Sequence, residues 1–259
     1  MVQVLNAVQR FTRVDGGIKF ICSQVLFRQD GITYCARSPS RHVGQEVDVG
    51  KLDSIMPIPP EAYCPLLPPG CVIAPDPSHC HIKTPNLTSF GGVADLAGLV
   101  LQELATCEIL RKHPHPNIAT YYGCLASGGR VIALCFKGYP ESLMDKINPG
   151  HLNKSAFILS EDRGAERKKA ARYLPGIEEG IRHLHAHGRI HNDPNPANVM
   201  ISEDDAPVII DFDSSSAPGT GLDKVKRTYG YNDFDALAEL RVWLTGSSPT
   251  EFQFKEWTS

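Results

Sequence analysis

Three side chains that carry oxygen donors, Asp193, Asn198 and Asp211, lie within one short, turn-rich stretch of the 259-residue chain. Hard oxygen ligands of this kind suit Mg²⁺, which keeps several of its waters and takes further oxygens from substrate phosphates. A carboxylate beside such a site that is not needed as a ligand can orient a hydroxyl and accept its proton. The set is therefore typical of phosphoryl transfer, with Asn198 and Asp211 as metal ligands and Asp193 as the group that orients the acceptor hydroxyl.

The sequence around these residues predicts an antiparallel β-hairpin. Two β-branched runs, 199–202 and 208–210, flank the turn-forming segment EDDA. Asn198 and Asp211 are equally far from the centre of that turn, so we expect them to face each other across the open mouth of the hairpin. Asp193 lies in the loop that leads into this mouth. A D-x-x-x-x-N pattern alone is weak evidence for a phosphoryl-transfer site. Preceded by a histidine and followed by a hairpin and the pair DF, it is a much more specific signal.

These motifs resemble those of the protein kinase superfamily. HNDPNPAN (191–198) is similar to the family's catalytic loop H-R-D-x-x-x-x-N, and DFD (211–213) is similar to its metal motif D-F-G. Upstream, HPHPNIATYYGC resembles the turn between the single helix of the family's N-lobe and the next strand. The resemblance covers roughly residues 80–245. The combination of these stretches is similar to kinase-like domains of fungi. It implies ATP and Mg²⁺ as cofactors.

The resemblance also implies a lysine that holds the nucleotide phosphates and a glutamate that holds the lysine. Lys83 falls at the position of that lysine, and Glu103 follows twenty residues later. Glu103 lies on the apolar face of a predicted helix, where a carboxylate needs a cationic partner because unpaired burial is costly. Glu108 is the other candidate, but it lies off that face and four residues before Lys112, as in a solvated ion pair. We therefore prefer Glu103.

We expect a two-lobed α+β protein-kinase-like fold with a degenerate N-lobe and a truncated helical C-lobe. Residues 1–50 are assigned to an N-terminal extension, 51–137 to the kinase-like N-lobe and 138–259 to the truncated kinase-like C-lobe. The extension is predicted to form short strands or to be partly ordered. Eight prolines between positions 57 and 77 exclude a central strand there, because each proline removes a donor from the ladder.

Apolar spacing predicts the remaining elements. They are a short strand in 79–85, a helix in 94–112, a buried strand in 130–136, a helix in 170–187 and a helix near 232–244. The first helix is expected to end at HPHPNI, because a residue that precedes proline disfavours the helical conformation.

Several features of the family are missing. No GxGxxG stretch precedes Lys83, so the backbone contacts to phosphate are expected to be weaker or differently built. Asn195 stands where the family usually has a lysine, and Asp213 replaces the glycine of D-F-G, either as a further metal ligand or to stiffen the loop. Residues 214–231 are short and contain no APE-like stretch, so the usual platform for peptide substrates is expected to be lost. Asp233 matches the aspartate that braces the catalytic loop, and the last helices of the C-lobe are expected to be absent.

The histidines have plainer interpretations than catalysis or metal binding. HCH (79–81) has no second pair of ligands nearby in sequence, so we do not expect a zinc site. The histidines of HLHAH (183–187) fall near the end of a helix, where cationic side chains favour the dipole, and are expected at the cap and surface. His191 is expected to pack under Phe212 rather than to act as a base.

The composition is that of a globular protein, and its charge balance suggests no surface that binds nucleic acid or a membrane. Hydrophobic residues make up 42% of the chain, and its formal net charge is −3. The eight cysteines form no CxxC pair, and the N-terminus carries no signal-peptide pattern. We therefore expect reduced thiols and a cytoplasmic, intracellular location.

The sequence predicts an ATP- and Mg²⁺-dependent phosphotransferase of the protein Ser/Thr kinase type, which transfers the γ-phosphoryl of ATP to a hydroxyl. Two alternatives stay open. A pseudokinase that serves as a binding or scaffold module is favoured by the missing glycine-rich loop and the short segment after the metal motif. A small-molecule kinase is favoured by Asn195. Whether the acceptor is a protein or a small hydroxylated molecule, and the oligomeric state, do not follow from the sequence.

Overall fold

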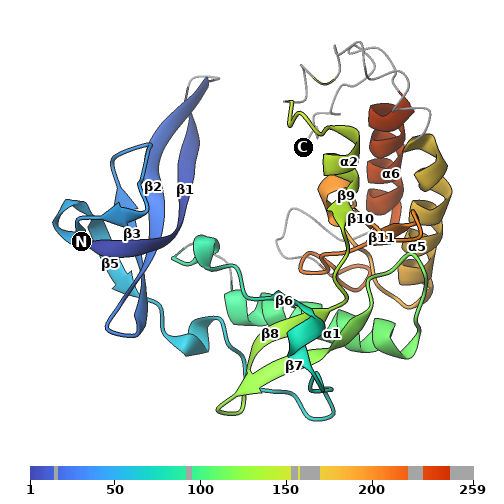
Figure 1. Cartoon of the computed structure of the whole chain (residues 1–259), viewed down its shortest axis with the longest axis horizontal. Helices are drawn as coiled ribbons and strands as arrows, with labels where there is room; N and C mark the ends of the chain where they lie inside the picture. Colours follow the sequence, from blue (N-terminus) through green and yellow to red (C-terminus); the bar gives the residue numbers. More distant parts are fainter. Residues whose placement is uncertain (15–16, 92–94, 153–156, 158–169, 221–229, 246–259) are drawn as a thin grey trace. The chain divides into compact units, whose positions relative to one another are not determined.

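A computed structural model of the chain describes residues 1–14, 17–91, 95–152, 157, 170–220 and 230–245 (Figure 1). They belong to two compact units. The first unit consists of Met1–Pro68, Thr84–Leu101 and Ala126–Ala133, and the second of Pro69–Lys83, Gln102–Leu125 and Leu134–Ser259. All five residues that the sequence predicts for the site belong to the second unit.

The first unit is built on a five-stranded sheet in the order β4-β1-β2-β3-β5. Its strands are β1 (Val2–Val14), β2 (Gly17–Gln29), β3 (Ile32–Ser38), β4 (Glu46–Val47) and β5 (Asp53–Pro57). β1 and β2 are longer than the short strands expected, and β2 turns tightly into β3 at Asp30 and Gly31, both of which have positive φ. That pair of conformations is the type I′ turn that Asp-Gly favours, since its twist matches that of the strands.

Both faces of the sheet are covered near the end of β2. Val25 and Phe27 pack on one face, and Leu26 packs with Cys35 and Ile58 on the other. The proline-rich segment that follows is irregular, as predicted: β5 stops at Pro57, and two 3₁₀ turns, Pro60–Ala62 and Pro77–His79, are its only helical pieces among the described residues.

Lys83 is the last residue of a short strand. β6 (His81–Lys83) pairs antiparallel with β8 (Arg130–Phe136), so that Lys83 lies opposite Leu134. β7 (Tyr121–Ser127) completes the sheet in the order β6-β8-β7. The helix predicted over 94–112 is α1 (Leu96–Lys112), while Ala94 lies outside the described residues. The predicted strands at 79–85 and 130–136 are thereby confirmed.

The second unit continues with helices and a small sheet. They are α2 (Leu143–Ile147), α5 (Leu174–Ala186) after a 3₁₀ turn (Ala171–Tyr173), α6 (Gly230–Thr245), and β9 (Glu141–Ser142), β10 (Val199–Ile201) and β11 (Pro207–Ile209) in the order β11-β10-β9. α5 buries the predicted apolar face, including Ile177, Ile181 and Leu184. Two glycines let this helix approach β11: a Cβ on Gly180 would lie 2.8 Å from Ile209 Cδ1.

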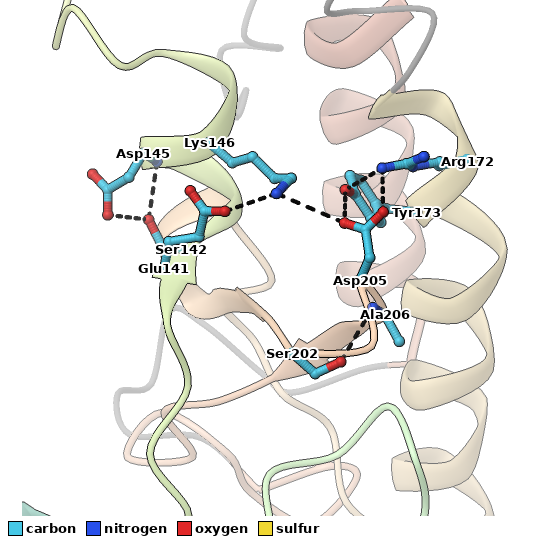
Figure 2. A network of polar contacts seen from close by, with 9 residues as sticks. All are labelled: Glu141, Ser142, Asp145, Lys146, Arg172, Tyr173, Ser202, Asp205 and Ala206. Atoms are coloured by element: carbon cyan, nitrogen blue, oxygen red, sulfur yellow. Dashed lines mark hydrogen bonds and ion pairs between the residues drawn. The ribbon is translucent and has the colours of Figure 1, made fainter.

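A polar network fixes the turn of the β10–β11 hairpin against two helices (Figure 2). The Tyr173 hydroxyl donates to Asp205 Oδ1 (2.6 Å), and Arg172 pairs with the other carboxylate oxygen. Lys146 from α2 bonds Glu141 at 2.7 Å and lies 3.7 Å from Asp205. The turn is thus tied both to the start of α5 and to α2. No helix among the described residues is long and apolar enough to cross a membrane.

Candidate active site

Lys83 bridges two carboxylates that are far apart in the sequence. Its Nζ lies 2.6 Å from Glu103 Oε1 on α1 and 2.5 Å from Asp211 Oδ1, just beyond β11. The Glu103 side chain is 6% exposed, whereas those of Lys83 and Asp211 are 28% and 33% exposed. Glu108 instead accepts from the Val72 N–H (2.9 Å) and pairs with Arg111, so the structure joins Lys83 to Glu103.

The charges of this cluster depend on one another. Burial raises the pKa of Glu103, and the neighbouring Lys83 acts in the opposite direction. Burial alone would lower the pKa of Lys83, but Glu103 and Asp211 together raise it well above its usual value. Lys83 is therefore firmly protonated at neutral pH, and it is the cation that a buried carboxylate requires.

Glu103 also positions the residue after Asp211. The Phe212 N–H donates to Glu103 Oε1 at 3.2 Å, and Phe212 is fully buried. The His191 ring meets Phe212 edge-on, with ring centroids 5.8 Å apart, and His191 Nε2 bonds the Ile210 carbonyl at 2.9 Å. His191 thus packs against Phe212 as the sequence suggested. Asp211 itself has φ of 66°, a conformation that costs energy for a residue other than glycine and recurs at functional sites.

The loop that carries Asp193 is held from α6. The carboxylate of Asp233, fully buried, accepts from the N–H groups of His191 (2.8 Å) and Asn192 (2.7 Å). His185 Nε2 lies 2.8 Å from the same carboxylate. Asn192 has a positive φ of 67°, and the bond to Asp233 holds it there. The brace expected of Asp233 is present, and His185 proves to be part of it rather than a surface residue of the helix end.

Asp193 and Asn198 meet directly. Asn198 Nδ2 donates to the Asp193 carboxylate and to its backbone carbonyl, both at 3.0 Å. Asn195, which the sequence places between them, caps the short 3₁₀ turn Pro196–Asn198: its side chain accepts from the backbone N–H groups of Ala197 and Asn198. Asn195 therefore shapes the loop.

The register of the hairpin differs by one residue from the prediction. β10 and β11 pair Val199 with Ile209, and the Ile210 N–H donates to the Asn198 carbonyl at 3.0 Å. Asn198 thus lies opposite Ile210, so the expectation that it directly faces Asp211 was wrong. The reason is the turn, whose closing pair is Ser202 and Ala206 and whose last loop residue, Asp205, has φ of 58°. A three-residue loop that ends in a left-handed residue shifts the pairing relative to a four-residue loop.

The comparison with known protein families agrees with this arrangement. The model of the protein kinase domain matches residues 95–234, which is more than half of the chain. The chain belongs to the protein kinase family.

Curated relatives of this kinase-family chain are distant and much longer. It is 25% identical over 53% of its length to CBL-interacting serine/threonine-protein kinase 24 of Arabidopsis thaliana, of which it covers 27%. It is 25% identical over 51% of its length to MAP kinase kinase kinase SSK2 of Saccharomyces cerevisiae, covering 7% of that protein. With CBL-interacting protein kinase 26 of Oryza sativa subsp. japonica the identity is 28% over 46% of the chain, and 22% of the relative is covered.

In the part of the chain that the structure describes, no group of three or more His, Cys, Asp or Glu side chains is arranged to hold a metal ion. His79 belongs to a 3₁₀ turn and His81 to β6. Asp213 accepts from the Ser214 hydroxyl at 3.2 Å.

Proposed function

We propose that the chain is an ATP- and Mg²⁺-dependent phosphotransferase of the protein Ser/Thr kinase type. The observation that carries the proposal is the bridge from Lys83 to Glu103 and Asp211, because it gathers three of the five expected groups from positions 83, 103 and 211. The names of the curated relatives support a protein as the acceptor.

The residues present fit the two cofactors. Among the described residues no hydrogen bond reaches Asp211 Oδ2 or the amide oxygen of Asn198, so both hard oxygens are open to a cation. Asp211 and Asn198 would hold Mg²⁺, and Lys83 would contact the nucleotide phosphates. When bound, the metal neutralises charge on the phosphates and so assists the transfer of the γ-phosphoryl group.

The chain's own residues then prepare the acceptor. The exposed carboxylate of Asp193 is positioned to accept a hydrogen bond from a Ser or Thr hydroxyl and to take its proton. Asn198 donates to Asp193 and fixes the direction of that carboxylate. Asp233 holds the backbone of the loop, so that Asp193 does not have to be ordered when the acceptor arrives.

We infer that the small lobe is degenerate. The residues ahead of Lys83 form a 3₁₀ turn at Pro77–His79 and a proline-rich segment, where the family has its glycine-rich hairpin. Less of the phosphate charge is then met by backbone N–H groups, and more of the contact depends on Lys83.

One observation favours a second function, that of a pseudokinase used as a binding module. Lys83 contacts Asp211 at 2.5 Å, so the lysine neutralises the carboxylate that the metal would need. A chain with little affinity for MgATP would keep this pair permanently.

The test is the melting temperature with ATP, with Mg²⁺ and with both, for the wild-type chain and Asp211→Asn. A ligand at a hundredfold excess over its Kd stabilises the folded state by about 2.7 kcal/mol, which raises the melting temperature by several degrees. Asp204→Asn, an exposed carboxylate in the turn of the same hairpin, is the matched control. We expect a Mg²⁺-dependent rise that persists in Asp204→Asn and is lost in Asp211→Asn. No rise in the wild-type chain at millimolar MgATP would favour the binding module.

A further inference from the structure

A cavity of about 370 Å³ lies in the second unit, against the loop that carries Asp193. We call it the α6 cavity. Its described walls come from α2, from the loop around Asp193 and from α6, together with Leu152 and Phe157. This volume is in the lower part of the range for ligand pockets, which suits one large side chain better than an extended ligand.

One face of α6 forms the long wall. Ala236, Leu240 and Trp243 recur at the spacing of one helical face, so the wall extends for about 10 Å at 1.5 Å per residue. The Asp233 carboxylate, near the start of α6, holds the loop of Asp193, which places that loop at this end of the wall. At the other end Phe157 stacks on Trp243, with ring centroids 4.9 Å apart. The cavity therefore leads from Asp193 to an aromatic pair.

The charges of the lining limit what the cavity accepts. Asp193 and Glu239 are the charged side chains among its described lining residues, which include no lysine or arginine. A phosphate or carboxylate group would meet two carboxylates and no cation, so acidic acceptors are disfavoured. Apolar groups dominate the remainder, from Met144 to Trp243.

We propose that the α6 cavity binds a large apolar side chain of the acceptor peptide, within about three residues of the phosphorylated Ser or Thr. The proposal rests on the proposed function, because it takes Asp193 as the residue that meets the hydroxyl. An extended peptide advances about 3.3 Å per residue, so the wall of about 10 Å corresponds to three residues. A leucine, methionine or phenylalanine at that distance reaches the apolar end while the hydroxyl lies at Asp193. The cavity thus selects the sequence around the phosphorylated residue.

The experiment fills the cavity by substitution and measures the change in preference for the residues around the phosphorylated Ser or Thr. The probe is a set of Ser/Thr peptide libraries, each with one residue fixed at one position, phosphorylated with radiolabelled MgATP. Ala236→Phe places a ring in the cavity, and Ala238→Phe adds the same ring on the exposed side of the same helix. Glu239→Lys, at an exposed position of the rim, reverses a charge without filling space. The MgATP-dependent rise in melting temperature is measured for all four chains.

We expect the wild-type chain to prefer a large apolar residue at one position within three of the Ser or Thr, by roughly tenfold or more. Ala236→Phe should lose that preference and Ala238→Phe should keep it. Glu239→Lys should raise the acceptance of acidic residues, and it carries the test if Ala236→Phe does not fold. All folded variants should keep the rise with MgATP.

Three outcomes would overturn the proposal. The first is a wild-type chain without apolar preference, or one whose preference survives in Ala236→Phe. The second is a chain that binds MgATP but labels only small hydroxylated molecules and no peptide. In both cases the proposed nucleotide site stands and the acceptor pocket fails. In the third, MgATP causes no rise in any chain, and the proposed function fails together with the pocket.

Discussion

Replacing Lys83 with methionine should leave Glu103 as a buried carboxylate without a cation. Breaking a buried ion pair by removing one partner costs about 3–5 kcal/mol. Two features of the structure reduce this energetic cost. The Phe212 N–H still donates to Glu103, and the Lys83 side chain is 28% exposed in the wild-type chain, so some water reaches the site. Asp211 is 33% exposed and is solvated when its partner is lost. We therefore expect a loss of about 2–3 kcal/mol near pH 7, or a fall of roughly 5–10 °C in melting temperature.

The double variant Lys83→Met/Glu103→Gln separates the charge effect from the loss of the lysine itself. Glutamine has the shape of glutamate, and its oxygen can still accept from Phe212, so the double variant should recover most of the lost stability. The single variant should also gain stability as the pH falls toward that of carboxyl titration, because burial holds the pKa of Glu103 above its usual value and the neutral acid needs no cation.

Thermal and urea unfolding of the wild type and the three variants, including Glu103→Gln alone, measure these effects as a double-mutant cycle. The account of the buried Lys83–Glu103 ion pair is wrong if Lys83→Met has the melting temperature of the wild type, or if the double variant is no more stable than Lys83→Met.

Three further predictions concern residues of α5 and α6. Burial lowers the pKa of His183 from its usual value of 6.5, so the unfolded chain binds a proton at this imidazole more readily than the folded chain does. The stability of the folded state should therefore fall as the pH drops below 6.5, and it should fall by less in His183→Gln. Melting curves at stepped pH measure both effects. Asp233→Ala leaves two backbone N–H groups without their acceptor and should cost about 2–4 kcal/mol in urea unfolding, whereas Asp235→Ala, exposed on the same helix, should cost little. Gly180→Ala should cost about 1–3 kcal/mol because its Cβ would lie 2.8 Å from β11. Gly138→Ala, whose Cβ would meet nothing within 4 Å, should be neutral. Equal unfolding midpoints for the two variants would refute the close approach of α5 to β11.

The sequence was sufficient where one periodic pattern or one motif decided the matter. The apolar face of α5, the strands at Lys83 and at 130–136, and the hairpin after Asn198 all follow from local spacing and appear in the structure. The family followed from two motifs, and the match of the kinase domain over residues 95–234 confirms it. The boundaries 1–50, 51–137 and 138–259 stay a prediction.

Errors arose where a single backbone conformation decided the outcome, and where a contact joined residues far apart in the sequence. The left-handed φ of Asp205 makes the hairpin loop three residues long and shifts Asn198 by one place, and the composition of EDDA does not reveal this. The antiparallel pairing of β2 with β3 depends on the turn at Asp30 and Gly31, for which the Asp-Gly pair was a usable signal. His185 was assigned to the cap and surface because it lies near the end of a helix. Its partner, Asp233, lies 48 residues away, so local spacing does not reveal the contact.

The central claim, that Asp193 prepares an acceptor hydroxyl at a live kinase site, is tested most directly by Asp193→Asn. Transfer of radiolabelled phosphate from MgATP to Ser/Thr peptides is measured beside the MgATP-dependent rise in melting temperature. We expect the rise to persist and the rate of transfer to fall by about a hundredfold or more, the range of an oriented general base. Transfer by Asp193→Asn at the wild-type rate, or a wild-type chain that binds MgATP and transfers nothing, would contradict the account.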